Sequence, residues 1–252
     1  QGRQLPDQAL VVREGETHLG EGERGEEEVM VDVGPLGLLA LQEFPARGQV
    51  EEEVSHLHAG ARRSGGLESL GKMRLRDVDC WVFDLDNTLY PASCRLFDQV
   101  DRRIGEYVQQ LLKLDPVAAR ALQKQYFRDH RTTLNGLMIH HRIRPEDFLD
   151  FVHAIDLSPV AEDRRLDAAL DRLPGRKVIY TNGSVRHAEN VMGKLGVARH
   201  FEDVFDIAAA GYVPKPEISA YRAMLVRHGI DPTRAAMLDD MPRNLAPAAE
   251  LG

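Results

Sequence analysis

The pattern of hydrophobic and polar positions changes character near residue 73. Before that point no helical or strand period is sustained, whereas a short apolar run at 78–83 predicts a buried strand. Between residues 93 and 173 apolar side chains recur at steps of three and four, which predicts a series of amphipathic helices. Asp115-Pro116 and Pro145 fit helix starts, because proline is favoured in the first helical turn.

After residue 174 strand and helix patterns alternate. The predicted strands are 177–180, 204–207 and 235–238, and the predicted helices are 185–195, 216–228 and 243–251. Together with the strand at 78–83, this order predicts an α/β fold with a parallel sheet and helices on both faces. In such sheets the ligand binds beyond the carboxyl ends of the strands.

The acidic, glycine-rich forepart at 1–72 is set apart from the rest. It holds 14 acidic against 7 basic residues and only one aromatic residue, so it has little with which to build a core. The chain begins with Gln1, and Met73 stands just before the first strand. We expect residues 1–72 to be a disordered or non-native extension and the natural protein to start at Met73. A genuine flexible tail is the alternative.

Composition argues against nucleic-acid-binding, membrane-spanning, secreted and disulfide-rich proteins. The net charge of −8 over 252 residues argues against a nucleic-acid-binding surface as the main feature. There is no apolar run of about 18 residues and no signal-peptide pattern. Cys80 and Cys94 are too few for a disulfide framework and are interpreted as reduced thiols. We therefore expect a cytoplasmic protein, with no membrane segment and no nucleic acid polymer as a partner.

Two carboxylates, Asp84 and Asp86, follow the first predicted strand directly. Crowded carboxylates are costly unless a cation neutralises them, and Mg²⁺ suits an all-oxygen site that recruits a substrate phosphate. One carboxylate could then attack phosphorus while the other moves protons. The plain structural alternative is a polar turn in which Asp86 caps a helix.

Three further polar loops follow the later strands or precede their helices. Thr181 and Asn182, before a helix start, could hold a phosphate, and Lys215 could balance the charge of a transferring phosphoryl group. Asp239 and Asp240 would complete a metal site. Each loop has an ordinary reading: an Asn-Gly turn, a solvated lysine and a pair of acidic residues at a helix N-terminus. All four loops fall at the same end of successive strands, which favours one shared site.

These motifs resemble those of the haloacid dehalogenase superfamily of phosphohydrolases, and the helical insert resembles its type 1 cap. The detail is similar to the pyrimidine 5′-nucleotidase group. The matching stretches are DLDNTLYP at 84–91, TTLNGL at 132–137, FLDFVH at 148–153, YTNG at 180–183, HAENV at 187–191 and DDMPRNL at 239–245. The resemblance implies a parallel Rossmann-like sheet, with core segments 73–92 and 174–252 and a helical cap at 93–173.

The resemblance also implies roles for the residues of the four loops. Asp84 would be the nucleophile that forms an aspartyl-phosphate, and Asp86 would protonate the leaving oxygen and then activate water. Thr181 and Asn182 would hold the phosphate, and Lys215 would stabilise its charge.

A Mg²⁺ site completes what the resemblance implies. It would use Asp84, the Asp86 carbonyl and Asp240, with Asp239 close behind. Because dehalogenase members lack an acid at the position of Asp86, the reaction expected is phosphate ester hydrolysis. The expected substrate is a small phosphorylated molecule, namely a pyrimidine nucleoside 5′-monophosphate.

Two departures from the superfamily's pattern leave alternatives open: the forepart at 1–72 has no counterpart there, and an edge strand is missing. The superfamily's sheet normally has one more edge strand after the helix at 243–251, and this strand is absent from the sequence, so a truncated chain is expected. The alternatives to the nucleotidase are a phosphatase of the same fold that acts on a sugar phosphate, and a catalytically silent binding module. In the cap, Thr132, Thr133 and Asn135 either touch the substrate base or form a loop that joins two helices.

Overall fold

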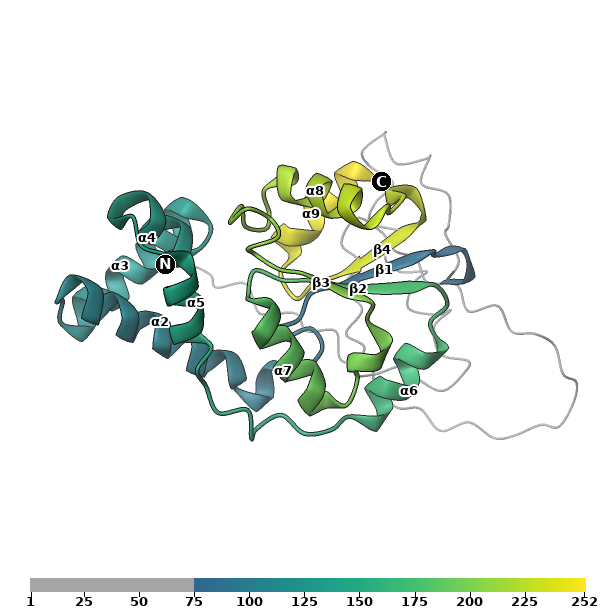
Figure 1. Ribbon diagram of the computed structural model, residues 1–252, viewed down its shortest axis with the longest axis horizontal. Helices are drawn as coiled ribbons and strands as arrows, with labels where there is room; N and C mark the ends of the chain where they lie inside the picture. The colour runs from purple at the N-terminus through teal and green to yellow at the C-terminus, as the bar shows by residue number, and fades with distance from the viewer. Residues whose placement is uncertain (1–74) are drawn as a thin grey trace, which may run out of the picture.

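The computed structural model describes residues 75–252, which form two lobes joined by two chain connections (Figure 1). One lobe is a sheet covered by helices on both faces, and the other is a bundle of helices. The expectations for residues 1–72, including the start at Met73, lie outside the described residues.

A parallel sheet of four strands forms the centre of the larger lobe. The strands are β1 (Cys80–Phe83), β2 (Arg176–Tyr180), β3 (Asp203–Phe205) and β4 (Ala235–Leu238). Their order is β3-β2-β1-β4, and Phe83 lies opposite Ile179 on one side and Leu238 on the other. The predicted α/β class with a parallel Rossmann-like sheet is confirmed, and each strand lies within two residues of its predicted bounds.

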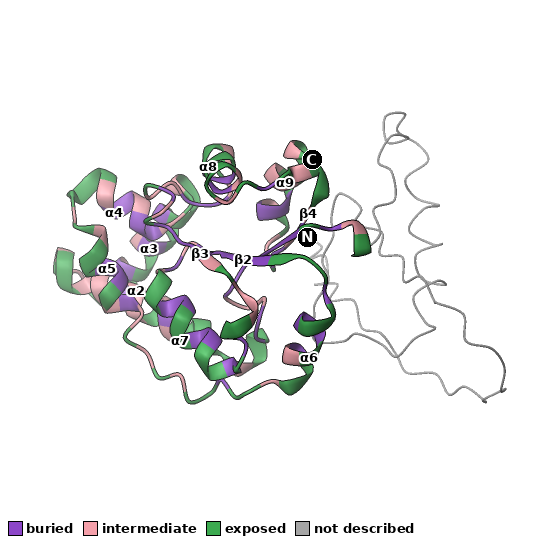
Figure 2. Ribbon diagram, turned by 45° about the vertical axis from the view of Figure 1, so that its right-hand side comes forward, coloured by how far each residue is buried: buried purple, intermediate pink, exposed green. Residues whose placement is uncertain are grey.

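Helices cover both faces of this sheet, as predicted (Figure 1). Successive side chains of a strand point to opposite faces, so Trp81 and Phe83 pack into one apolar layer while Cys80 and Val82 pack into the other. All four of these β1 residues are buried, and Figure 2 shows buried positions along much of the central sheet. The covering helices are α6 (Arg164–Arg172) and α7 (Val185–Leu195) on one face and α8 (Ile218–His228) and α9 (Pro242–Leu251) on the other.

The second lobe is inserted between β1 and β2 and has an apolar core of its own, built around residues such as Val108, Leu137 and Phe148. Its helices are α2 (Leu96–Leu112), α3 (Pro116–His130), α4 (Thr133–His141) and α5 (Pro145–Val152). The predicted helix start at Asp115 is confirmed, since its carboxylate accepts hydrogen bonds from two backbone N–H groups of the first turn of α3. Short 3₁₀ turns are found at Leu75–Asp77, Ala92–Cys94, Ala198–His200 and Pro232–Arg234.

Of the residues considered for base contact or for a helix-joining loop, only Thr132 lies between two helices, because helix α4 occupies Thr133–His141. Thr132 caps this helix by accepting a hydrogen bond from the Asn135 N–H at 3.1 Å. The helix contains Gly136, a poor helix former, and lacks a clear apolar stripe. Packing on Tyr126 of α3 accounts for the glycine, since a Cβ at position 136 would lie 2.5 Å from the Tyr126 ring.

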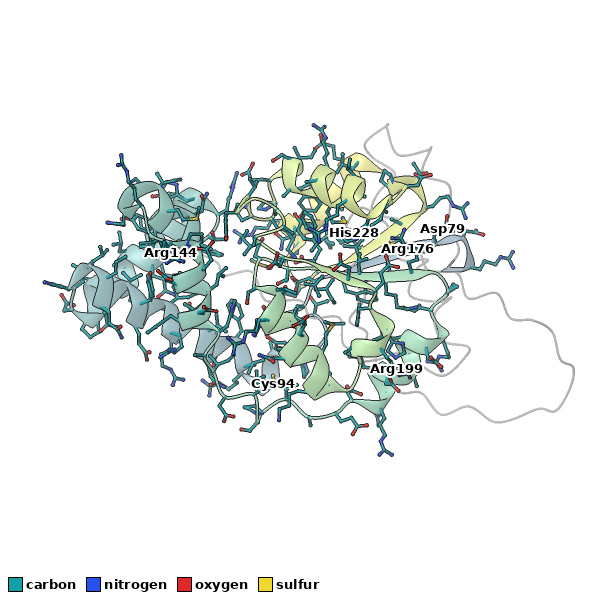
Figure 3. All side chains as sticks on the ribbon, viewed as in Figure 1. Asp79, Cys94, Arg144, Arg176, Arg199 and His228 are labelled. Carbon is teal, nitrogen blue, oxygen red and sulfur yellow. The ribbon has the colours of Figure 1, made fainter. Side chains whose placement is uncertain are left out.

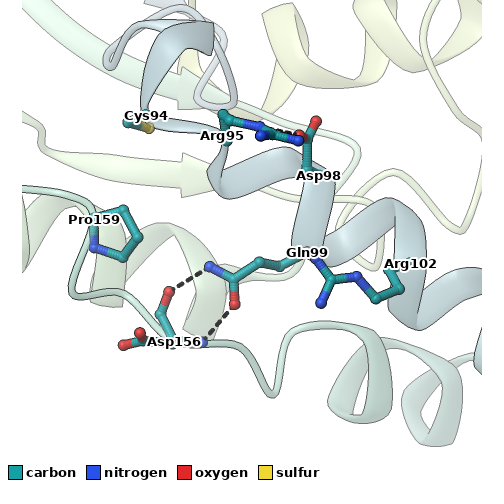
Figure 4. A pocket seen from close by; sticks show the side chains of 7 residues that line it. All are labelled: Cys94, Arg95, Asp98, Gln99, Arg102, Asp156 and Pro159. Atoms are coloured by element: carbon teal, nitrogen blue, oxygen red, sulfur yellow. Dashed lines mark hydrogen bonds and ion pairs between the residues drawn. The ribbon is translucent and has the colours of Figure 1, made fainter.

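The two connections between the lobes are tied to each other near the start of α2. The Gln99 side chain donates to the Asp156 carbonyl at 2.8 Å and accepts from the Asp156 N–H at 3.0 Å (Figure 4). A hollow of about 370 Å³ lies beside this pair and is lined by residues of both connections. None of its lining residues belongs to the predicted site.

Ion pairs join neighbouring strands at their amino ends. Arg234, before β4, pairs with Asp79, before β1, and Arg176, at the start of β2, pairs with Glu202, before β3. Figure 3 labels Asp79 and Arg176 at this end of the sheet. Both pairs are solvent-exposed, and such pairs contribute about 0–1 kcal/mol each. Most of the sheet's stability therefore comes from its two apolar layers. No helix among residues 75–252 is both long and apolar enough to cross a lipid bilayer.

We expect Gly136→Ala to lower the free energy of unfolding by roughly 1–3 kcal/mol, because the added methyl group overpacks the contact with Tyr126. Gly193→Ala in α7 is the matched control. Nothing lies within 4 Å of a Cβ at that position, so alanine should stabilise the helix by roughly 0.5–1 kcal/mol. Denaturant unfolding measures both, and equal effects of the two substitutions would contradict the packing of α4 on α3.

Candidate active site

The carboxyl ends of the strands bring three predicted side chains into direct contact. Asp84 directly follows β1, Asp239 directly follows β4, and Lys215 precedes α8. The Lys215 ammonium donates to Asp84 Oδ1 and Asp239 Oδ2, both at 2.7 Å, and to the Tyr180 carbonyl at 2.8 Å. One cation therefore bridges two carboxylates that lie 155 positions apart in the sequence.

Burial shifts the pKa values of the charged groups in this cluster. The Lys215 side chain is 1% exposed. Although burial alone would lower the pKa of Lys215, the charges of Asp84 and Asp239 raise it, so the ammonium form is favoured. Burial, opposed by Lys215 and reinforced by Asp239, raises the pKa of Asp84. The cluster holds its negative charge at a cost, which an added cation would reduce.

Donors on the surrounding loops occupy most of the remaining carboxylate oxygens. Thr88 donates to Asp84 Oδ2 at 3.0 Å, and its hydroxyl accepts from the Asp240 N–H at 3.0 Å. Asp239 Oδ1 accepts from the Met241 N–H at 2.9 Å and from the Asn244 side chain at 2.8 Å. Neither Thr88 nor Asn244 was among the predicted site residues, although both lie within the matched motifs DLDNTLYP and DDMPRNL.

The acidic cluster fits a divalent cation. Carboxylate oxygens of Asp84, Asp239 and Asp240 lie within 4.8 Å of one another, and an all-oxygen set of this kind suits Mg²⁺. Asp239 already uses both oxygens for hydrogen bonds. Within the described residues, the Asp86 carbonyl has no hydrogen-bond partner, and the Asp240 carboxylate has none besides its own backbone N–H. Asp84 accepts one hydrogen bond at each oxygen, against three in all for Asp239. Asp240, the Asp86 carbonyl and Asp84 are therefore the better candidates for direct ligands, with Asp239 behind them.

The loop after β2 forms a hydrogen bond with the backbone of the loop that carries Lys215. Asn182 Oδ1 accepts from the Lys215 N–H at 2.8 Å, so the amide fixes the lysine backbone. Thr181 Oγ1 accepts from the Gly183 N–H at 2.9 Å, which leaves its own hydrogen free to donate. The predicted pair thus lies beside the cluster, but the Asn182 side chain has a structural role that the sequence did not reveal.

Asp86 is held by two side chains that had no predicted role. The Tyr90 hydroxyl donates to Asp86 Oδ1 at 2.5 Å, and His187 Nε2 lies 2.8 Å from the same oxygen. Burial opposes ionisation of Asp86, but the neighbouring His187 and the two hydrogen bonds prevail, so the pKa of Asp86 is lowered. Burial, together with the nearby His187, lowers the pKa of His153 to about 3. His153 therefore stays neutral near neutral pH.

The polar residues of the cap that were considered for base contact are engaged elsewhere. Thr133 Oγ1 is buried and donates to the Gln123 carbonyl at 3.1 Å, and the Asn135 side chain donates to the His130 carbonyl at 3.1 Å. Together with the capping role of Thr132, these bonds serve the α3–α4 turn. They explain the TTLNGL stretch without a substrate.

Comparison with known proteins identifies the same family that the sequence motifs resemble. The family described as haloacid dehalogenase-like hydrolase matches residues 78–252. Phosphate metabolism protein 8 of Saccharomyces cerevisiae is 24% identical over 190 residues, 68% of this chain. The chain spans 59% of the length of that relative.

Solved structures resemble the chain more distantly. The UTR4 protein of Saccharomyces cerevisiae is 19% identical, with a TM-score of 0.43, over 69% of this chain and 88% of that one. L-2-haloacid dehalogenase from Xanthobacter autotrophicus, with chloropropionic acid covalently bound, is 17% identical, with a TM-score of 0.40, over 69% and 75%. Because these TM-scores are below 0.5, family membership rests on the sequence match.

The stabilisation of the fold by Mg²⁺ should depend on pH. Desolvation, together with the charge of Asp239, raises the pKa of Asp240 to about 6. A raised pKa means that the metal-free fold loses stability as the pH rises through 6, and that a cation, which needs the ionised form, restores it. We expect Mg²⁺ affinity to fall roughly tenfold per pH unit below that pKa. Thermal unfolding with and without Mg²⁺ from pH 5 to 7.5 measures this.

Asp240→Asn is the control for this pH dependence. The amide does not titrate, so the shift in Tm caused by Mg²⁺ should be small at every pH. A wild-type shift that is equally large at pH 5 and pH 7.5 would contradict the placement of Asp240 in the cation site.

Proposed function

The chain belongs to the haloacid dehalogenase-like hydrolase family, and we propose that it is a Mg²⁺-dependent phosphomonoesterase. The observation that carries the proposal is the buried contact of Lys215 with Asp84 and Asp239, together with a second, separately held carboxylate at Asp86. A nucleophile, a charge-balancing cation and a proton-transfer group are thereby gathered at one end of the sheet.

In the first step, Asp84 attacks the phosphorus of the ester. The bond from the Asp84 oxygen to phosphorus forms while the bond from phosphorus to the ester oxygen breaks, and the protonated form of Asp86 gives its proton to the departing oxygen. Because the pKa of Asp86 is lowered, this protonated form is the minor one in the free enzyme near neutral pH. Lys215 lies 2.7 Å from Asp84 and balances the charge that gathers on the phosphoryl oxygens. The hydroxyl of Thr181 and the backbone at Asn182 hold those oxygens.

In the second step, water releases the phosphate. Asp86, now ionised, takes a proton from a water molecule, whose oxygen bonds to phosphorus while the bond from Asp84 to phosphorus breaks. The hydrogen bonds that lower the pKa of Asp86 favour the ionised form that this step requires. Asp84 returns to its starting state.

A Mg²⁺ ion would be held by Asp84, Asp240 and the Asp86 carbonyl, with Asp239 behind them. When bound, it would offset the crowded carboxylate charge and draw a substrate phosphate to the site. Asp239 and Asn244 would keep the loop that bears Asp240 in place.

The proposed substrate is a pyrimidine nucleoside 5′-monophosphate. The support is the match of the motif stretches to the pyrimidine 5′-nucleotidase group, and the proton-transfer acid at Asp86 favours phosphate ester hydrolysis over dehalogenation. A sugar phosphate remains the second candidate, because the polar residues of the α3–α4 turn are used within the bundle and do not argue for a base. The complete set of acidic residues and Lys215 speaks against a silent binding module.

We expect the wild-type chain to release phosphate from at least one member of a panel of nucleoside monophosphates and sugar phosphates, fastest from uridine or cytidine 5′-monophosphate. Chelation by EDTA should stop release, and added Mg²⁺ should restore it. Asp84→Asn should abolish turnover with an unchanged Tm or a higher one, because an amide cannot attack phosphorus and the burial of one charge is relieved. Phosphate release by Asp84→Asn at the wild-type rate would exclude the covalent route.

A further inference from the structure

Only one of the two carboxylate oxygens of Asp86 forms hydrogen bonds with side chains. Both the Tyr90 hydroxyl and His187 Nε2 contact Oδ1, at 2.5 and 2.8 Å. Within the described residues Oδ2 has no hydrogen-bond partner. Two contacts on one oxygen fix the plane of a carboxylate and leave the other oxygen available for a reacting group.

The imidazole of His187 is itself tightly held. Its side chain is 1% exposed, and its ring stacks on that of His153 with centroids 4.3 Å apart and an interplanar angle of 7°. His153 Nδ1 lies 2.9 Å from the Ser184 hydroxyl. The same hydroxyl caps α7 by accepting from the His187 N–H at 3.3 Å. His187 therefore has little freedom to turn away from Asp86.

This stack joins the two lobes next to the candidate active site. His153 directly follows α5 of the helical bundle as its C-cap, whereas His187 lies in the first turn of α7, beside the sheet. Asp86 follows β1 and lies in the segment through which the chain leaves the sheet for the bundle. The placement of the Asp86 carboxylate thus depends on contacts from both lobes.

We propose that His187, assisted by Tyr90, is a positioning residue that fixes Asp86 Oδ1 so that Oδ2 can exchange a proton with the ester oxygen and with water. This inference rests on the proposed phosphomonoesterase function. Proton transfer requires the donor within hydrogen-bond reach of the reacting oxygen, so loss of positioning should impair proton delivery selectively. His153 and Ser184 take part by keeping the His187 ring in its place.

Substrates with different leaving groups separate this role from a general loss of structure. An alkyl phosphate needs a proton on its departing oxygen, whereas p-nitrophenyl phosphate departs as a stable phenolate and needs none. For His187→Ala we expect kcat/KM to fall roughly tenfold or more with the best alkyl phosphate of the panel, but less than about threefold with p-nitrophenyl phosphate. His187→Gln, which keeps an N–H donor, should recover part of the alkyl phosphate activity. Asp86→Asn should show the same selectivity, with a larger fall.

Two further variants keep the test decisive. Tyr90→Phe removes only one hydroxyl and should give a smaller loss with the same selectivity, even if His187→Ala does not fold. His200→Gln is the matched control, because His200 forms a similar buried contact with Asp167, at 2.7 Å, away from the candidate active site. It should leave the ratio of the two kcat/KM values unchanged.

The outcomes distinguish this inference from the function on which it rests. No phosphate release by the wild-type chain from any substrate would overturn both. Release by the wild-type chain, with an equal fall for both substrate types or no fall at all in the folded variants of His187 and Tyr90, would overturn the positioning role alone.

Discussion

The contact on which the candidate site depends is the buried bridge from Lys215 to Asp84 and Asp239. Taking three charged groups out of water is costly, and their mutual attraction offsets that cost only when each is paired at close range. The bridge meets this condition, and the Tyr180 carbonyl accepts a further hydrogen from the ammonium. Removing the cation from such a cluster typically costs about 3–5 kcal/mol, since the two carboxylates would then stay buried without a partner. The residues proposed for chemistry therefore also tie the loop after β3, which carries Lys215, to the loops after β1 and β4 and to the end of β2.

Sheet topology explains why residues so far apart in sequence can form this bridge. In a parallel sheet all carboxyl ends lie at the same edge, and β1 lies between β2 and β4. Asp84 is thus placed between the loop that carries Asn182 and the loop that carries Asp239. The short apolar strands fix this arrangement through two buried layers, while the helical bundle, inserted after β1, meets the sheet lobe at the stacked His153 and His187. The strands thus form a rigid scaffold, and the loops that follow them carry the residues proposed for chemistry.

The sequence predicts those parts of the molecule that depend on local pattern. Apolar runs located the strands, Asp115-Pro116 located a helix start, and the four polar loops pointed to one end of the sheet, where Asp84, Lys215 and Asp239 do meet. It failed for α4, since Gly136 and the weak periodicity there reflect packing against Tyr126. It also missed the contacts of His187 and Asn182, because partners 101 and 33 positions away are chosen by tertiary packing, which a pattern along the chain does not contain.

The central claim is that Asp84 becomes covalently bonded to phosphorus during turnover. The most direct test is to mix the chain with a cleavable phosphate ester and Mg²⁺, quench in acid within one turnover, reduce with borohydride and map the peptides by mass spectrometry. Borohydride converts an aspartyl-phosphate to homoserine, so the account predicts that change at position 84 alone, only when substrate is present. Phosphate release with no modification at position 84, or with the modification at another carboxylate, would contradict it.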